Sequence, residues 1–181
     1  MAGLEVFSEL GYDAATTKKV AERAGLNESL LHRYFESKRG LLFAIIGSSV
    51  EDENQSLIYP PGKTVEQEIF QFLSNRFQHA AKQAAFLRVV FSRVLVDPNL
   101  HKEMRRHFGQ RMSALLKERL GAFKKKGELH SDIDVDDLIE NIVAQGFAVG
   151  FVGHVVMGRR PRESVQLLRT FSRNIAHGVA K

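Results

Sequence analysis

Apolar residues recur along most of the chain at intervals of three and four positions, which is the spacing of one face of an α-helix. The strict alternation of a half-buried strand does not persist anywhere. The pattern therefore predicts an all-α fold. Prolines mark its boundaries because their rings interrupt helices, and they occur at Pro60, Pro61, Pro98 and Pro161.

The stretch from Ile58 to Lys63 contains Pro-Pro-Gly and predicts a division between two domains, 1–53 and 54–181. Beyond it, Thr64 and Gln67 form a capping-box pattern at the start of a helix. The apolar face of that helix consists of Val65, Ile69, Phe72, Leu73 and Phe77. Three further helices are expected at about 100–126, 136–157 and 161–179, the last opening with Pro161.

Residues 15–50 carry closely spaced helix boundaries. Thr17 is expected to cap a helix that ends at Gly25, and Asn27 is expected to cap the next helix. This spacing predicts a helix-turn-helix unit whose second helix can enter a DNA major groove. The small core of the unit is expected to contain Val20, Ala21, Ala24, Leu30, Leu31 and Phe35, and Ser37 is expected to cap a further helix starting at Lys38.

Residues 7–42 resemble the TetR family of transcriptional regulators. The resemblance rests on Phe-x-x-x-Gly-Tyr at 7–12, Val-Ala-x-x-Ala-Gly-Leu at 20–26, Tyr-Phe at 34–35 and Ser-Lys-x-x-Leu-Leu at 37–42. It implies an N-terminal helix-turn-helix DNA-binding domain followed by a helical ligand-binding and dimerisation domain. It also implies a homodimeric repressor on a palindromic double-stranded DNA operator, released by a small-molecule effector and needing no cofactor.

The resemblance implies DNA contacts for Thr17, Lys18, Asn27, Glu28, Ser29, Leu30, His32, Arg33, Tyr34 and Lys38. Lys18 and Lys38 match phosphate-contacting positions, and Arg33 suits a bidentate contact with guanine. Leu30 stands where the family often has threonine, and His32 where it often has tyrosine. Glu28 presents a carboxylate to a polyanion, which is tolerable where it accepts a hydrogen bond from a cytosine amino group.

Large apolar side chains in the second domain offer a candidate effector pocket, and packing in an ordinary core is the alternative. Two polar residues, Gln145 and His154, interrupt an apolar stretch and are suited either to orienting a ligand or to a satisfied position in the core. An apolar or aromatic effector is expected. The candidate pocket residues are Phe86, Phe91, Phe108, Met112, Gln145, Phe147, Phe151 and His154.

Three glycines in the expected helix 136–157 each cost about 1 kcal/mol relative to alanine, and they predict that another backbone approaches closely. The resemblance implies that this helix and the last one pair with their symmetry mates in a four-helix dimer interface. The candidate interface residues are Gly146, Gly150, Gly153, Leu168, Phe171 and Ile175.

Composition excludes several other classes of protein. The absence of cysteine excludes disulfide frameworks, thiolate zinc sites and cysteine nucleophiles. The chain contains neither a His-Glu-x-x-His zinc motif nor a Gly-x-Ser-x-Gly elbow, so no enzyme is expected. The aspartates of 132–137 fit helix capping better than a calcium loop.

No run of about 18 apolar residues and no signal sequence stands out, which predicts a cytoplasmic protein without a membrane span.

The net charge of +5 is unevenly distributed. Residues 1–50 sum to zero, and the excess lies in 105–126 and 159–173, which we interpret as solvated helix faces in preference to a second polyanion site. A neutral first domain with a short first helix predicts weak nonspecific DNA affinity for one subunit. The alternative to a regulator is therefore a dimeric ligand-binding or interaction protein of the same fold with impaired DNA binding.

Overall fold

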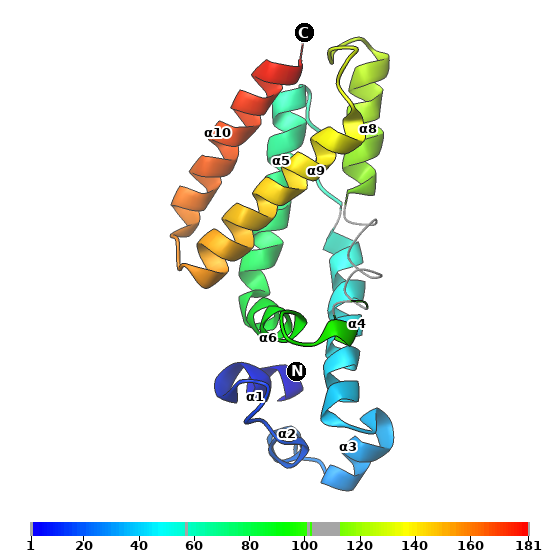
Figure 1. Cartoon of the computed structure of the whole chain (residues 1–181), viewed down its shortest axis with the longest axis vertical. Helices are drawn as coiled ribbons and strands as arrows, with labels where there is room; N and C mark the ends of the chain where they lie inside the picture. The colour runs from blue at the N-terminus through cyan, green and yellow to red at the C-terminus, as the bar shows by residue number, and fades with distance from the viewer. Residues whose placement is uncertain (1, 57, 101, 103–112, 181) are drawn as a thin grey trace. The chain divides into compact units, whose positions relative to one another are not determined.

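The computed structural model describes residues 2–56, 58–100, 102 and 113–180, with the backbone alone for 49–56. These residues are mainly helical, with one isolated bridge between Leu129 and Ala180, so the all-α prediction is confirmed (Figure 1). The chain divides into two compact units, Met1–Glu53 with Gln83–Phe108 and Asn54–Lys82 with Gly109–Lys181. The described residues 83–100 therefore group with the first unit, although the sequence pattern placed them in the second domain.

The first unit contains α1 (Ala2–Leu10), α2 (Thr17–Ala24), α3 (Glu28–Phe35), most of α4 (Lys38–Ser56) and α6 (Ala84–Val94). Helix α1 packs against both α2 and α6. The buried side chains form one core that includes Val6, Phe7, Val20, Ala21, Leu31, Leu41, Leu42, Ile46, Phe86, Val89 and Val90.

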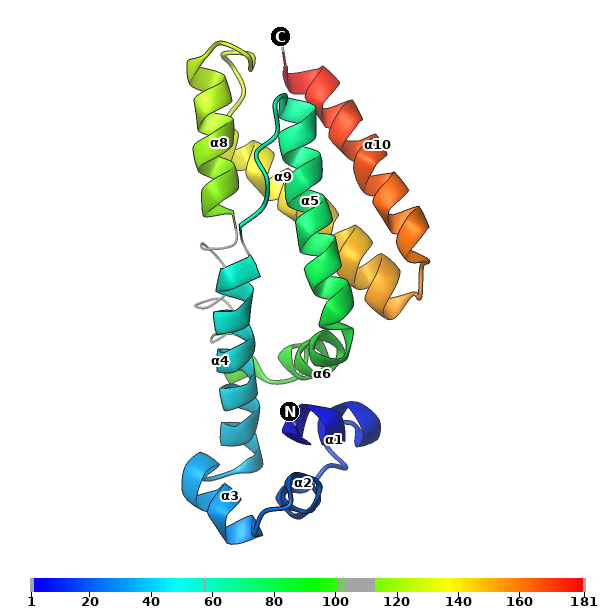
Figure 2. The ribbon, with the colours of Figure 1, turned by 180° about the vertical axis from the view of Figure 1, so that it is seen from behind.

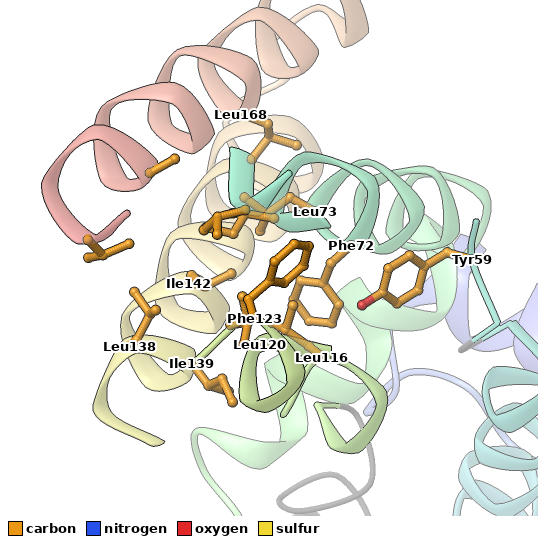
Figure 3. Packing of buried hydrophobic residues seen from close by; sticks show 14 of the residues in the cluster. Tyr59, Phe72, Leu73, Leu116, Leu120, Phe123, Leu138, Ile139, Ile142 and Leu168 are labelled. Atoms are coloured by element: carbon orange, nitrogen blue, oxygen red, sulfur yellow. The ribbon is translucent and has the colours of Figure 1, made fainter. Parts of the chain in front are cut away.

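The second unit is built around α5 (Val65–Lys82). This helix contacts α8 (Ala114–Lys125), α9 (Val135–Phe147), the π-helix η1 (Ala148–Val156) and α10 (Pro161–Val179), and Figure 2 shows α10 running alongside it. The predicted apolar face of α5 is confirmed, since all five residues are buried. Leu73 packs in the same cluster as Ile142, Leu120 and Leu168 (Figure 3). Of the helix expected at 100–126, residues 101 and 103–112 lie outside the described residues.

Local signals explain most of the helix ends. Thr64 Oγ1 accepts from the amide of Gln67 at 3.2 Å, and Asp134 Oδ1 accepts from the amides of Asp136 and Asp137 at 2.7 and 3.2 Å, so both predicted caps are confirmed. The hydrogen bonds from these two amides hold the pKa of Asp134 below its usual value. Gly158 adopts a positive φ of 69° before Pro161 opens α10.

A buried carboxylate anchors the Pro-Pro-Gly turn to the second unit. Glu68 is fully buried, and its Oε1 accepts from the hydroxyl of Tyr59 at 2.7 Å and from Nη1 of Arg119 at 3.3 Å. Its Oε2 accepts from the amide of Gly62 at 2.7 Å. Burial and the hydrogen bond to Glu68 raise the pKa of Tyr59 far above its usual value. Paired and hydrogen-bonded in this way, the charge is tolerated inside the core.

Candidate nucleic-acid interface

Caps and a tight turn orient α2 and α3 with respect to each other. Helix α2 is capped by Thr16, whose Oγ1 accepts from the amide of Lys19 at 3.2 Å, so the prediction that Thr17 caps this helix is wrong by one residue. Gly25 ends α2 in the left-handed region with φ 67°, as predicted. Oδ1 of Asn27 accepts from the amide of Ser29 at 3.0 Å and starts α3. These contacts confirm the predicted helix-turn-helix.

Helix α3 has a buried and an exposed face. Leu31 is 4% exposed in the core of the first unit, and Phe35 packs against that core. Leu30 is 39% exposed and Tyr34 is 75% exposed, while Arg33 is exposed between them. The expectation that Leu30 belongs to the small core is therefore wrong, because its position on the helix turns it away from Leu31.

A polar bridge joins the start of α2 to α3. Thr17 Oγ1 donates to Oε1 of Glu28 at 2.7 Å, and Nε2 of His32 lies 3.4 Å from the same hydroxyl and 3.7 Å from the same carboxylate oxygen. Three residues assigned to DNA contact from the sequence therefore contact one another. The geometry gives Glu28 a partner within the domain, in place of the cytosine considered from sequence alone.

Lys38 is held by the loop between α1 and α2. Its ammonium group donates to the carbonyl oxygens of Tyr12, Asp13 and Ala15 at 2.9, 3.2 and 3.0 Å, and it lies 4.6 Å from the centre of the Tyr12 ring. Since an ammonium group has three N–H donors, all of them are engaged. The sequence assigned this lysine to phosphate, but the structure gives it a positioning contact inside the first unit.

The same loop is tied to α6. Nη1 of Arg93 lies 3.1 Å from Oδ1 of Asp13, and its guanidinium group lies 4.7 Å from the centre of the Tyr12 ring. Burial raises the pKa of Tyr12. Lys38 and Arg93 therefore both fix the entry to α2, through contacts that no local sequence signal predicts.

The structure divides the predicted pocket residues between the two units. Phe86 is 3% exposed in the core of the first unit, and Phe91 lies on the same helix, α6. In the second unit, Phe147 stacks on Phe151 with ring centres 5.1 Å apart. Gln145 is half-buried on α9. Two other predicted residues, Phe108 and Met112, lie outside the described residues.

The predicted pocket residue His154 has partners within its own chain. Its Nδ1–H donates to the carbonyl oxygen of Arg159 at 2.7 Å, and its ring meets Phe77 edge-on at 5.3 Å. Of the two readings left open by the sequence, this geometry is that of a satisfied packing residue.

The glycines assigned to the dimer interface face neighbours within the chain. A Cβ on Gly146 would lie 3.0 Å from Leu73, and one on Gly150 would lie 3.9 Å from Ala80; both neighbours belong to α5. A Cβ on Gly153 would lie 2.2 Å from the guanidinium group of Arg159. Close neighbours within the chain therefore account for Gly146 and Gly153 without a second subunit, whereas Gly150 has only ordinary contacts.

The last helix also presents a different face from the one expected. Leu168 is fully buried within its own unit, so its assignment to a subunit interface is wrong, and Phe171 and Ile175 pack partly against the same core. The sequence pattern did not assign the exposed apolar side chains nearby to an interface; these are Phe147, Val152, Val156, Met157 and Leu167. The expectation that no segment could span a membrane is qualified by one finding. By length and composition alone, Val135–Val156 is long and apolar enough for a membrane span, and a third of it is buried within the protein.

Comparison with known proteins agrees with the helix-turn-helix geometry. Residues 1–45 match the family described as bacterial regulatory proteins, tetR family. The chain is 46% identical to the tetracycline repressor protein class G of Vibrio anguillarum over 44 residues, which are 24% of this chain and 21% of that protein. It is 25% identical over 143 residues to YdeS of Bacillus subtilis, described as an uncharacterized HTH-type transcriptional regulator, covering 78% of this chain and 70% of the relative.

Solved structures share the whole fold. A TetR transcription regulator from Haloarcula marismortui superposes with a TM-score of 0.77 at 16% identity, covering 99% of this chain and 95% of that one. GusR of Salmonella enterica superposes with a TM-score of 0.73 at 18% identity, covering 98% and 94%. Residues 1–45 thus match the tetR family of bacterial regulatory proteins, and the chain is a DNA-binding transcriptional regulator.

Proposed function

We propose that the protein is a cytoplasmic homodimeric repressor that binds a palindromic operator through two copies of α3. A small molecule bound in the second unit releases it. The observation that carries the DNA-binding part is the division of α3 into an inner face closed by Leu31 and an outer face that exposes Ser29, Leu30 and Arg33. A recognition helix needs such an outer face to reach base edges.

Arg33 is the proposed reader of guanine. Its guanidinium group has no ion-pair partner in the part of the chain that the structure describes, so its donors are available for O6 and N7 of a guanine. Lys18 and Tyr34 are exposed and are proposed to contact phosphates. Thr17 and Lys38 instead have positioning roles, because their donors are engaged within the domain. Thr17 joins the start of α2 to α3, and Lys38 holds the α1–α2 loop.

The dimer is proposed to form through the apolar surface of η1, α10 and the last residue of α9, Phe147. Phe147, Val156 and Leu167 are 45%, 58% and 43% exposed, which is unusual for residues of this size. A twofold axis through this surface would bury the same residues from both protomers. On a palindromic operator, the two recognition helices of a dimer are expected in successive major grooves, whose centres are about 34 Å apart.

Release by an effector is supported by polar atoms buried on α5. Within the described residues, Ser74 Oγ and Asn75 Oδ1 are shielded from solvent and have no hydrogen-bond partner. Buried polar atoms without partners are costly, and a polar group on a bound molecule would relieve that cost. We propose an effector with an apolar or aromatic body that favours a dimer whose two α3 helices are wrongly spaced for the operator.

The DNA-binding proposal is tested by selecting bound duplexes from a random pool at low salt. An enriched palindrome with half-sites about one helical turn apart is expected. Arg33→Ala should then weaken specific binding by roughly 5-fold to 150-fold per half-site, corresponding to about 1–3 kcal/mol. Arg162→Ala, an exposed arginine at the start of α10, is the matched control and should bind normally. A pool without enrichment would favour the alternative, a binding or interaction protein with impaired DNA recognition.

The effector proposal needs a separate measurement once the operator is known. Compounds that raise the melting temperature of the free protein are tested for release of the operator duplex. Asn75→Leu should abolish release by such a compound while leaving operator binding intact, because Asn75 lies in the second unit. Full release from the variant would remove Asn75 from the effector site.

A further inference from the structure

We infer that Leu30 reads the methyl group of a thymine beside the guanine read by Arg33, so that an apolar contact specifies one position of each half-site. This inference rests on the proposed function, since it concerns the same surface of α3. It predicts a thymine in each half-site of the operator. It also gives a role to Leu30, which lacks the hydroxyl group often found at this position in the family that the chain resembles.

The position of Leu30 on α3 carries the first step. Leu30 and Arg33 are three residues apart and both exposed, so they are neighbours on the outer face of the helix. The inner face is closed by Leu31 at 4% exposed, while Leu30 remains 39% exposed. The core of the first unit therefore does not account for a leucine at position 30.

The neighbouring polar groups supply the second step. The hydroxyl of Ser29 donates to Oδ1 of Asn27 at 3.0 Å. The carboxylate of Glu28 accepts from Thr17 at 2.7 Å. Two hydrogen-bonding groups at the start of α3 are thus engaged within the helix-turn-helix, which leaves Arg33 to form hydrogen bonds with bases and Leu30 to offer apolar surface.

The chemistry of the major groove supplies the third step. Thymine alone presents a methyl group there, whereas the other bases present only hydrogen-bond donors and acceptors beside leucine. A polar base edge covered by Leu30 would lose water without gaining a partner. Side chains three residues apart on a helix lie about 5–6 Å apart, and successive base pairs are about 3.4 Å apart. The thymine should therefore lie one or two base pairs from the guanine.

The test uses the duplex recovered by selection from the random pool. Each thymine is replaced in turn by deoxyuridine, which pairs identically and lacks only the methyl group. At one position per half-site the wild-type protein should lose about fourfold in affinity, or about fifteenfold with both half-sites changed, as expected for one buried methyl group at each. Leu30→Ala should bind the thymine and uracil duplexes about equally well.

A matched variant separates the contact from a general effect of losing an exposed leucine. Leu10→Ala removes a leucine that is 42% exposed at the end of α1, and it should retain the full sensitivity to uracil. Unchanged melting temperatures and unchanged nonspecific DNA affinity for Leu30→Ala would show that α3 is intact.

Two results would overturn the inference while leaving the proposed function standing. In the first, a palindrome is enriched but no thymine in it is sensitive to loss of its methyl group. In the second, Leu30→Ala remains as sensitive to uracil as the wild-type protein. A pool that enriches no sequence would instead contradict the proposed function, and the inference would fail with it.

Discussion

Replacing Lys38 with alanine should destabilise the first unit without removing a phosphate contact. The wild-type ammonium group donates to three carbonyl oxygens of the α1–α2 loop, so the variant leaves those carbonyls without their donor. The family resemblance alone leads to the opposite expectation, namely intact stability and weaker DNA binding. The substitution therefore distinguishes a positioning residue from a phosphate contact.

The magnitude follows from the contacts. The hydrogen bonds to Tyr12 and Ala15 are part-buried, whereas the one to Asp13 is exposed and is replaced by water at little cost. Two hydrogen bonds from a charged donor contribute about 1.5 kcal/mol each at the lower end of their range. The contact with the Tyr12 ring contributes about 0.5 kcal/mol more. The free energy of unfolding should fall by about 3.5 kcal/mol.

Urea unfolding at a fixed protein concentration measures this loss. With an m-value of about 2 kcal/mol per M, the midpoint should fall by roughly 1.8 M. Lys18→Ala is the matched control, because Lys18 is exposed in the first turn of α2. Its midpoint should stay unchanged, while the slope of log affinity against log salt should become shallower by about 1.8 for a dimer that loses two phosphate contacts.

The reasoning would be refuted if Lys38→Ala kept the wild-type urea midpoint and showed the shallower salt slope. That result would place its ammonium group on a phosphate in the complex and require it to leave the α1–α2 loop. A fall in the midpoint together with an unchanged salt slope, measured where the variant is fully folded, is the expected outcome.

Three further predictions concern the second unit. Glu68→Ala removes the acceptor that Arg119 and the Tyr59 hydroxyl share, and it should lower the free energy of unfolding in urea by about 3–5 kcal/mol. Tyr59→Phe should lower it by less than half as much, and equal losses from the two variants would contradict the buried network. Gly62→Ala places a Cβ 2.2 Å from the amide nitrogen of Glu68 and should destabilise by about 1–3 kcal/mol, while Gly121→Ala, with open space around it, should stabilise by about 0.5–1 kcal/mol. Because the pKa of Asp134 is lowered in the folded protein, its charge stabilises the fold at neutral pH, and this contribution is lost as the pH falls through the lowered pKa. The wild-type protein should therefore exceed Asp134→Asn in stability at pH 6 and lose that advantage in acid; a constant difference between pH 6 and acid would contradict this assignment.

Helix boundaries were the features that the sequence determined best. Gly25, Asn27 and Pro161 act at the positions predicted for them, and Asp134 is the one of the aspartates in 132–137 that caps α9. A cap depends on a side chain and an amide two or three residues away, or on the backbone conformation of one residue, so its energy is local. The apolar stripe of α5 was predictable for a similar reason, since helical spacing alone places those residues on one face.

The partners of polar and small residues were decided by tertiary structure. Lys38 meets carbonyl oxygens 23 to 26 residues earlier in the chain, and Glu28 meets the hydroxyl of a residue 11 positions earlier. Neither partner could be identified from the residues that flank Lys38 or Glu28 in the sequence. Gly146 and Gly153 likewise suggest a subunit contact until Leu73 of α5 and Arg159 are placed beside them.

The sequence by itself therefore determined the fold class, the helix-turn-helix and the resemblance of residues 7–42 to the TetR family, because these depend on caps, spacing and short motifs. Tertiary structure alone decided which residues of α3 remain exposed, where α6 packs, and which charges already have partners. The physical reason is that a helix fixes the direction of a side chain, whereas exposure and pairing depend on the elements that close over it from elsewhere in the chain.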